Sequence, residues 1–217
     1  TVKPTVNTQP VTVQLDANGD ASITANAIDN GSTDNCTISS RSLDVTTFTC
    51  ANLGANTVTL TVTDQTGNSE SATAIVTVED SIKPTVLTKN FTVQLDGSGT
   101  ASISSSDIEN GSSDNCSIAS SSLDITSFTC ANLGSNTVTL SVADTSGNTG
   151  TNTAIVTVED NINPVAITKN ITVQLNASGT VTISVDDVDN SSTDNCSITS
   201  KSLDVSSFTC ANIGANT

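Results

Sequence analysis

Residues 58–78 read VTLTVTDQTGNSESATAIVTV, and apolar side chains alternate with polar ones in both halves of this stretch. Such alternation is typical of a β-strand with one buried face. Between the halves, Asp64-Gln-Thr-Gly-Asn68 consists of residues that favour turns. The stretch therefore predicts a β-hairpin with an apolar face built from Val58, Leu60, Val62, Ala72, Ala74, Val76 and Val78.

The sequence before this hairpin also predicts strands. Residues 11–15 and 21–24 alternate in the same way around a turn at Asp16–Asp20, which suggests a second hairpin. Two shorter strands are expected near 37–43 and 46–50, and no helical period appears. About seven strands separated by frequent turns predict an immunoglobulin-like β-sandwich, with a core of Val, Ile, Leu and Ala around Phe48.

The whole pattern recurs at a constant interval along the chain. Asp34-Asn-Cys returns at Asp114 and Asp194, and Phe48-Thr-Cys-Ala-Asn returns at 128 and 208. We therefore expect an all-β chain of tandem immunoglobulin-like domains at 1–80, 81–160 and 161–217. The third lacks its last hairpin, which fits a piece of a longer array or strands donated by a neighbouring chain. Pro84 and Pro164 stiffen the domain entries, and almost no linker separates the domains, so an extended rod is predicted.

Composition excludes several functions. The chain has no His, Trp, Tyr or Met, and its 22 acidic against 6 basic residues give a net charge of −16. Without His there is no Ser-His-Asp triad, no Cys-His pair and no His-bound metal. A charge of this sign repels nucleic acid, and no apolar run approaches the ~20 residues of a membrane span. The sequence therefore predicts neither an enzyme nor a membrane-inserted segment.

Six cysteines occur two to a repeat, at Cys36, Cys50, Cys116, Cys130, Cys196 and Cys210. The even count and constant spacing predict one disulfide inside each domain, for example Cys36–Cys50. A metal site or a catalytic thiol is the alternative, but two thiolates without His make a poor site of either kind. The disulfides imply an oxidising, extracellular setting.

Acidic residues also recur from repeat to repeat, among Asn and Ser side chains. Clustered oxygen ligands on loops are what Ca²⁺ binds, whereas the alternative is that Asp and Asn cap turns through hydrogen bonds to the backbone. Acidic residues at the repeat boundary, such as Glu79-Asp80, would share Ca²⁺ with the next domain or lie solvated at a strand end. The positions considered as Ca²⁺ ligands are Asp29, Asp34, Asp44, Asp80, Glu109, Asp114, Asp124, Asp160, Asp189, Asp194 and Asp204.

Three motifs together resemble a known family: Ser32-Thr-Asp-Asn-Cys36, the turn segment 61–68 (TVTDQTGN) and the closing segment 76–80 (VTVED). They are similar to hyalin-repeat (HYR-like) and related immunoglobulin-like repeats of giant cell-surface adhesins of Bacteroidota, including the SprB-type gliding-motility adhesins. The resemblance implies an exported surface filament, secreted by the type IX system and held by outer-membrane anchoring machinery. The 14-residue spacing of the Cys pair departs from the usual hyalin-repeat spacing.

Two classes of function remain open. The first is a structural stalk of a cell-surface adhesin, whose partners in this segment are neighbouring repeats and whose adhesive contact with a surface or glycan lies at a distal site. The second is a carbohydrate-binding or spacer module of a secreted polysaccharide-degrading enzyme. Sugar sites usually stack the ring on Trp or Tyr, and the chain has neither.

Overall fold

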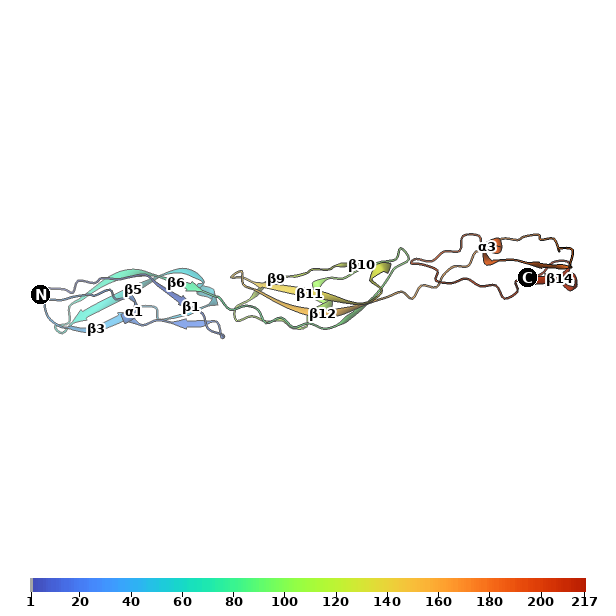
Figure 1. Ribbon diagram of the computed structural model, residues 1–217. Helices are drawn as coiled ribbons and strands as arrows, with labels where there is room; N and C mark the ends of the chain where they lie inside the picture. Colours follow the sequence, from blue (N-terminus) through green and yellow to red (C-terminus); the bar gives the residue numbers. More distant parts are fainter. Residues whose placement is uncertain (1) are drawn as a thin grey trace. The chain divides into compact units, whose positions relative to one another are not determined.

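The computed structural model describes residues 2–217, and each of the two complete repeats contains one four-stranded and one two-stranded sheet (Figure 1). The elements of the first repeat are β1 (Val11–Gln14), β2 (Asp20–Ser22), α1 (Ala25–Ile28), β3 (Ile38–Leu43), β4 (Thr47–Thr49), η1 (Cys50–Asn52), β5 (Gly54–Asp64) and β6 (Ser69–Glu79). The all-β, sandwich-like class predicted from the sequence is confirmed.

The larger sheet has the strand order β1-β6-β5-β3, and the smaller one pairs β2 with β4. The hairpin of β5 and β6 is the one predicted from residues 58–78, with Val58 opposite Ala74. The second predicted hairpin is wrong. Its turn does form, because Asp16 N donates to Asp20 O at 2.9 Å, but β1 pairs in parallel with β6 while β2 pairs with β4. The turn therefore carries the chain from one sheet to the other.

The core of the first repeat lies between these two sheets. Phe48 is 1% exposed, and the alternating residues of β5 and β6 are buried as predicted, except that Ala72 is half-buried. Burying one such apolar side chain contributes roughly 1.5–3 kcal/mol, so a core without Trp or Tyr depends on many of them. The buried apolar side chains are Leu15, Ile23, Ile28, Phe48, Val58, Leu60, Val62, Ala74, Val76 and Val78.

The sequence predicted no helix and seven strands, whereas the first repeat has two short helical turns and six strands. The turn α1 exists because it buries Ile28 completely, and one turn is too short to produce a helical period in the sequence. All helices of the described chain have three or four residues, and none is long enough to cross a membrane.

The second repeat reproduces the first. Its larger sheet has the order β7-β12-β11-β9, and its smaller sheet pairs β10 with β8. Phe128 takes the place of Phe48 and is also 1% exposed. The elements are β7 (Phe91–Gln94), β8 (Thr100–Ser102), α2 (Ser105–Ile108), β9 (Ile118–Leu123), β10 (Ser127–Thr129), η2 (Cys130–Asn132), β11 (Gly134–Asp144) and β12 (Thr149–Glu159).

The third repeat keeps only the smaller sheet, β13 (Thr180–Thr182) with β14 (Ser207–Thr209), together with α3 (Val185–Val188) and η3 (Cys210–Asn212). Residues 171–174, the counterpart of β1, form no strand, because the hairpin that would pair with them is missing. The apolar side chains that this hairpin would cover are open to solvent, and Val173 is 41% exposed.

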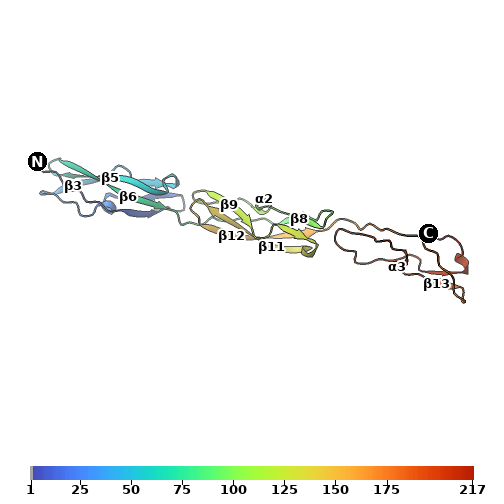
Figure 2. The ribbon, with the colours of Figure 1, turned by 90° about the horizontal axis from the view of Figure 1, so that it is seen from above.

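Each complete repeat receives and releases the chain at opposite ends of its long strands. Asn68, the residue before β6, donates from Nδ2 to Val2 O at 3.4 Å, and Leu15 N donates to Glu79 O at 2.9 Å, at the other end of β6. Eleven residues of β6 span roughly 36 Å at about 3.3 Å per residue. The strands β5 and β6 pair along most of this length, and the shorter β3 lies beside residues 60–64 of β5 (Figure 2).

By internal contacts the chain divides into two compact units that do not follow the repeat boundaries. Thr1–Lys89, Ser105–Asp124 and Val138–Ala154 form the first unit, and Asn90–Ser104, Ile125–Thr137 and Ile155–Thr217 form the second. The segments that connect the first repeat to the second therefore lie within the first unit. Those that connect the second to the third lie within the second. Domain boundaries near 80 and 160 stay predictions.

Candidate functional site

The cysteines join successive repeats. Cys50 is bonded to Cys116, and Cys130 to Cys196, with Cα–Cα distances of 5.5 and 5.4 Å. The predicted pairing within each repeat is therefore wrong.

The fold explains the correction. Cys36 lies near the hairpin turn, since Gln65 N donates to the O of the next residue, Thr37, at 3.1 Å, whereas Cys50 lies beside the Gly19 turn at the other pole. The six residues of β3 run between them and span roughly 20 Å, far beyond the ~7 Å between Cα atoms that a disulfide bridges. Each bond instead links one pole of a repeat to the facing pole of the next.

The two remaining cysteines of the described chain, Cys36 and Cys210, are free and exposed. Cys36 is the counterpart of Cys116, and Cys210 is the counterpart of Cys50. Each therefore occupies the position of one of the two partners in an inter-repeat bond, Cys36 that of Cys116 and Cys210 that of Cys50.

Close backbone packing accompanies each disulfide. Gly19 has a φ of +80°, and a Cβ there would lie 2.7 Å from Cys50 Sγ and 2.8 Å from Asn115 O. Asn115 Nδ2 donates to Asp16 O and to Asp80 Oδ1, each at 3.2 Å. The next junction repeats this arrangement through Gly99 and Asn195.

Three carboxylates from separate segments converge at the first junction. One oxygen each of Asp80, Asp114 and Asp144 lies within 4.8 Å of the others. Asp80 follows β6, Asp114 precedes β9, and Asp144 ends β11. Asp80 is 9% exposed and Asp144 only 3%. It is the one such cluster of His, Cys, Asp or Glu side chains within residues 2–217.

Hydrogen bonds hold these carboxylates in place. Asp144 Oδ1 accepts from Ser146 N at 2.9 Å and from Asn148 N at 2.8 Å, and Asn148 Nδ2 bridges Asp144 Oδ2 and Asp80 O. Asp80 Oδ1 also accepts from Asn115, as described above. Asp114 Oδ2 accepts from Cys116 N at 3.0 Å. The second repeat's hairpin turn is thereby connected to the last residues of the first repeat.

Sequence reasoning identified Asp80 and Asp114 but missed Asp144. Its position, and that of Asp64 one repeat earlier, was interpreted as part of a turn. The turn role is real, since Asp64 makes the same bonds to Thr66 N and Asn68 N, at 2.7 and 2.9 Å. The burial of its charged side chain is what distinguishes Asp144 from an ordinary turn residue, and burial is visible only in the fold.

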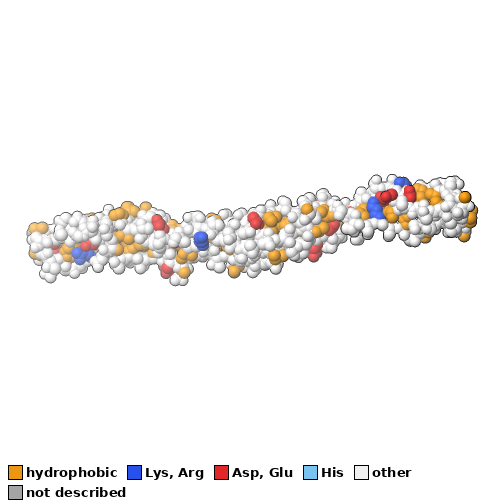
Figure 3. Space-filling view, in the orientation of Figure 1, with side chains coloured by type: hydrophobic (Ala, Val, Ile, Leu, Met, Phe, Trp, Pro, Cys, Tyr) orange, Lys and Arg blue, Asp and Glu red, His pale blue; other side chains and the backbone are white. Residues whose placement is uncertain are grey.

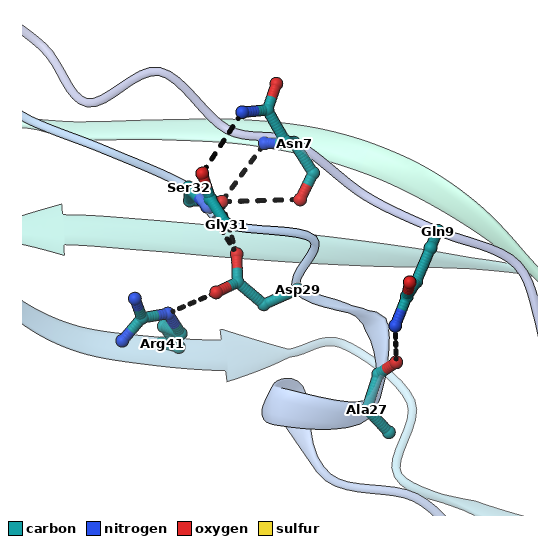
Figure 4. Close-up of polar contacts among 7 residues, drawn as sticks. All are labelled: Asn7, Gln9, Ala27, Asp29, Gly31, Ser32 and Arg41. Atoms are coloured by element: carbon teal, nitrogen blue, oxygen red, sulfur yellow. Dashed lines mark hydrogen bonds and ion pairs between the residues drawn. The ribbon is translucent and has the colours of Figure 1, made fainter.

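The predicted ligand Asp29 lies elsewhere and is occupied by protein groups (Figure 4). Its Oδ2 accepts from Arg41 Nε at 2.9 Å, and its Oδ1 accepts from the Ser32 hydroxyl and backbone N–H. Partial burial opposes ionisation of Asp29, but the bonds from Ser32 and the charge of Arg41 outweigh it and lower the pKa of Asp29. Asn7 N donates to Ser32 Oγ at 3.0 Å, so this network ties the first residues of the repeat to the loop.

Two counterparts of Asp29 have comparable protein partners. Asp189 accepts from Lys201 Nζ at 2.7 Å, and this bond, ahead of those from Ser192, lowers the pKa of Asp189 to about 2. Glu109 accepts from Ser112 N. The structure therefore does not bring the loop residues Asp29, Glu109 and Asp189 to a shared ligand position.

The other predicted ligands are also placed. Asp44 and Asp124 accept from the backbone N–H of Thr59 and Thr139, at 2.8 and 2.7 Å, and thereby fasten a loop to the long hairpin. Asp34, Asp160 and Asp194 each accept from the backbone N–H two residues further on. Asp204 accepts from the backbone N–H of the next residue. Capping of turns therefore accounts for contacts at each of these four residues.

Charged side chains are sparse on the surface. The face in Figure 3 shows scattered acidic and basic groups among uncharged polar atoms. Three ion pairs occur in the described chain, Lys3–Glu70, Arg41–Asp29 and Lys201–Asp189, and none involves the junction cluster.

No protein-family model matches the sequence, and no characterised protein matches it. Similar solved structures are extracellular cadherin domains 1–4 of protocadherin gamma B7, at 11% identity and a TM-score of 0.33, covering 81% of this chain and 56% of that one. Fibronectin(III)-like modules of Clostridium thermocellum CbhA match at 14% identity and a TM-score of 0.29, covering 72% and 94%. The I67–I69 fragment of titin matches at 14% identity and a TM-score of 0.32, covering 75% and 69%. The chain thus spans just over half of the protocadherin fragment, and likeness at this level says nothing about function.

Proposed function

We propose that these repeats are a structural spacer in the stalk of a secreted cell-surface adhesin, and that the adhesive contact is made elsewhere. The observation that carries the proposal is the covalent bond between each repeat and the next. A bond of this kind fixes the position of one repeat on its neighbour, which a spacer needs and a free-standing binding module does not. Disulfides also persist in the oxidising surroundings of extracellular proteins.

Energetics support this role. In the chain-entropy model, a disulfide that closes a loop of 66 residues stabilises the folded state by about 4 kcal/mol. This is a large share of the roughly 5–15 kcal/mol by which a domain is stable. The repeat core is built from aliphatic residues and a single Phe, so the bond compensates for a modest core.

The position of the chain ends within a repeat also supports a spacer. Entry near Val2 and exit near Glu79, at opposite ends of β6, make each repeat add length to an array. Secretion by the type IX system, a role in gliding and an extended rod stay predictions of the sequence and its resemblance.

Two measurements on the full 217-residue chain test the proposal. Peptide mapping without reductant should recover Cys50–Cys116 and Cys130–Cys196, with Cys36 and Cys210 open to alkylation. In small-angle scattering, a compact globule of this length has a radius of gyration of about 17 Å. Three repeats in line, each about 36 Å, give roughly 30 Å. The radius of gyration of a compact globule, or tight binding of the chain itself to a polysaccharide, would contradict a spacer.

A further inference from the structure

The junction cluster of Asp80, Asp114 and Asp144 brings together three carboxylates with no basic partner. The three ion pairs of the described chain use Asp29, Glu70 and Asp189 instead. Carboxylates this close repel one another, and the repulsion is strong where water is excluded. Burial of Asp80 and Asp144 thus creates a need for positive charge between them.

Two oxygen atoms at this junction have no hydrogen-bond donor. Oδ1 of Asp114 and Oδ1 of Asn115 are each buried, with less than 1 Å² exposed, and neither has a partner within the described chain. A buried acceptor without a donor is costly, and native proteins leave few of them. Oδ1 of Asp34 and Oδ1 of Asn195, the counterparts of these atoms in the first and third repeats, are likewise buried without a partner. These acceptors therefore need a partner other than a main-chain or side-chain donor, such as water or a cation.

From these two observations we propose that the cluster binds one Ca²⁺ ion between the first and second repeats. The inference rests on the proposed spacer function and deepens it. The available ligands are oxygens, which suit a hard cation, and the sulfur of Cys116 is already in a disulfide. Oxygens that share one Ca²⁺, each at about 2.4 Å from it, lie at most about 4.8 Å apart, and the three carboxylate oxygens lie within that limit.

The ion would link three segments. Asp80 belongs to the end of the first repeat, Asp114 to the loop of the second, and Asp144 to the hairpin turn of the second. The disulfide Cys50–Cys116 joins the same two repeats through Cys116, two residues from Asp114. Binding would therefore fix the orientation of a junction that is already covalently closed.

The chain has one complete set of these residues. The second junction retains Asp160 and Asp194, and Asn195 Oδ1 is again buried without a partner, but the counterpart of Asp144 falls after residue 217. At the other end, Asp34 and Asp64 correspond to Asp114 and Asp144, but the counterpart of Asp80 falls before residue 1. We expect one strong site per chain.

Calorimetric titration of the oxidised full chain with CaCl₂, after removal of metals by chelation, tests the inference. We expect one Ca²⁺ per chain and weaker binding of Mg²⁺. Asp144→Asn should weaken Ca²⁺ binding at least about tenfold, because it removes one charged ligand. Asp64→Asn is the matched control, since Asp64 makes the same turn bonds without a complete cluster, and it should leave Ca²⁺ binding unchanged.

Peptide mapping of both variants for Cys50–Cys116 shows whether the junction still forms, so a loss of binding is not confused with misfolding. Three outcomes would overturn the inference: no heat at millimolar Ca²⁺, an equal loss in both variants, or equal affinity for Mg²⁺. Scattering in the presence of chelator separates this inference from the spacer itself. If the radius of gyration stays at about 30 Å when Ca²⁺ is removed, the proposed spacer function stands even if the metal site is refuted.

Discussion

Gly19 is constrained both by its own backbone and by the neighbouring repeat. Its φ of +80° favours glycine, and a Cβ would collide with Cys50 Sγ and Asn115 O. Gly67 has a similar φ of +89° with no atom within 4 Å of a Cβ. Comparing substitutions at Gly19 and Gly67 therefore distinguishes the cost of backbone strain from the cost of a clash at the junction.

Gly19→Ala should lower the melting temperature more than Gly67→Ala. The backbone strain of a left-handed Ala costs about 1–2 kcal/mol in both variants, and only Gly19→Ala adds the clash with the junction. Gly19→Ala should also reduce the fraction of chains with Cys50–Cys116 closed, as measured by thiol counting after refolding. Equal effects of the two substitutions would show that the junction tolerates a side chain there.

Asp64 gives the stability of the chain a dependence on acid pH. The side chain of Asn68, followed by backbone N–H and Thr66 bonds that outweigh desolvation, lowers the pKa of Asp64 to about 2 from 3.8. A group whose pKa is lower in the folded state stabilises it above the unfolded pKa, and this contribution is lost as the pH falls from about 4 to 2.

Asp64→Asn cannot titrate, so its melting temperature should fall less steeply than that of the wild type between pH 4 and 2. Calorimetry over this range measures the difference. Between pH 6 and 7 the two curves should run parallel, which serves as the control. Parallel curves down to pH 2 would mean that the hydrogen bonds of Asp64 do not favour its charged form.

At the scale of elements, the long hairpin was predictable because its alternation extends over residues 58–78 with a turn in the middle. The pairing of the short strands β1 and β2 was predicted wrongly, because a turn sequence between two strands does not determine whether they pair with each other. Register and partner are set by the long strands, which bury Val76 and Val78 against β1. A segment as short as β1 carries too little pattern to reveal this.

The junction was only partly predictable for a related reason. The charges of Asp80 and Asp114 and the place of Asp80 near a boundary are visible in the sequence, but the pairing of cysteines is not. Constant spacing fits bonds within a repeat as well as bonds between repeats, and only the length of β3 decides between them. Asp144 was missed because its turn contacts explain it fully until its burial is known.

The third repeat allows a test of how strand β1 is stabilised. Residues 91–94 form β7 beside β12, whereas residues 171–174 have the same place in the repeat and no such neighbour. Hydrogen exchange followed by mass spectrometry should find the amides of 91–94 protected and those of 171–174 nearly unprotected. Residues 180–182 keep their partner β14 and should retain measurable protection. Equal protection at 91–94 and 171–174 would mean that this strand forms without the hairpin.

At the scale of the whole molecule, the disulfides determine which residues bear tension. Each bond joins cysteines separated by 66 positions, so residues 51–115 lie in one closed loop and residues 131–195 in another. The strands β5 and β6 lie entirely within the first loop. A force applied to the two ends therefore passes from Cys50 directly to Cys116, and from Cys130 directly to Cys196. In the second repeat only residues 116–130 bear it.

Single-molecule stretching should therefore give a much shorter contour length for the oxidised chain than for the reduced one. The two loops together hide roughly 450 Å of chain at about 3.5 Å per residue. The variant Cys50→Ser with Cys116→Ser opens one loop and should release about half of that length without reductant. Bonds within repeats would instead hide only the few residues between Cys36 and Cys50 and their counterparts, so a difference several times smaller would refute the connectivity. When its domains unfold, the oxidised chain extends only along residues 1–50, 116–130 and 196–217, less than half of its sequence, because extension beyond these loaded segments requires a disulfide to break.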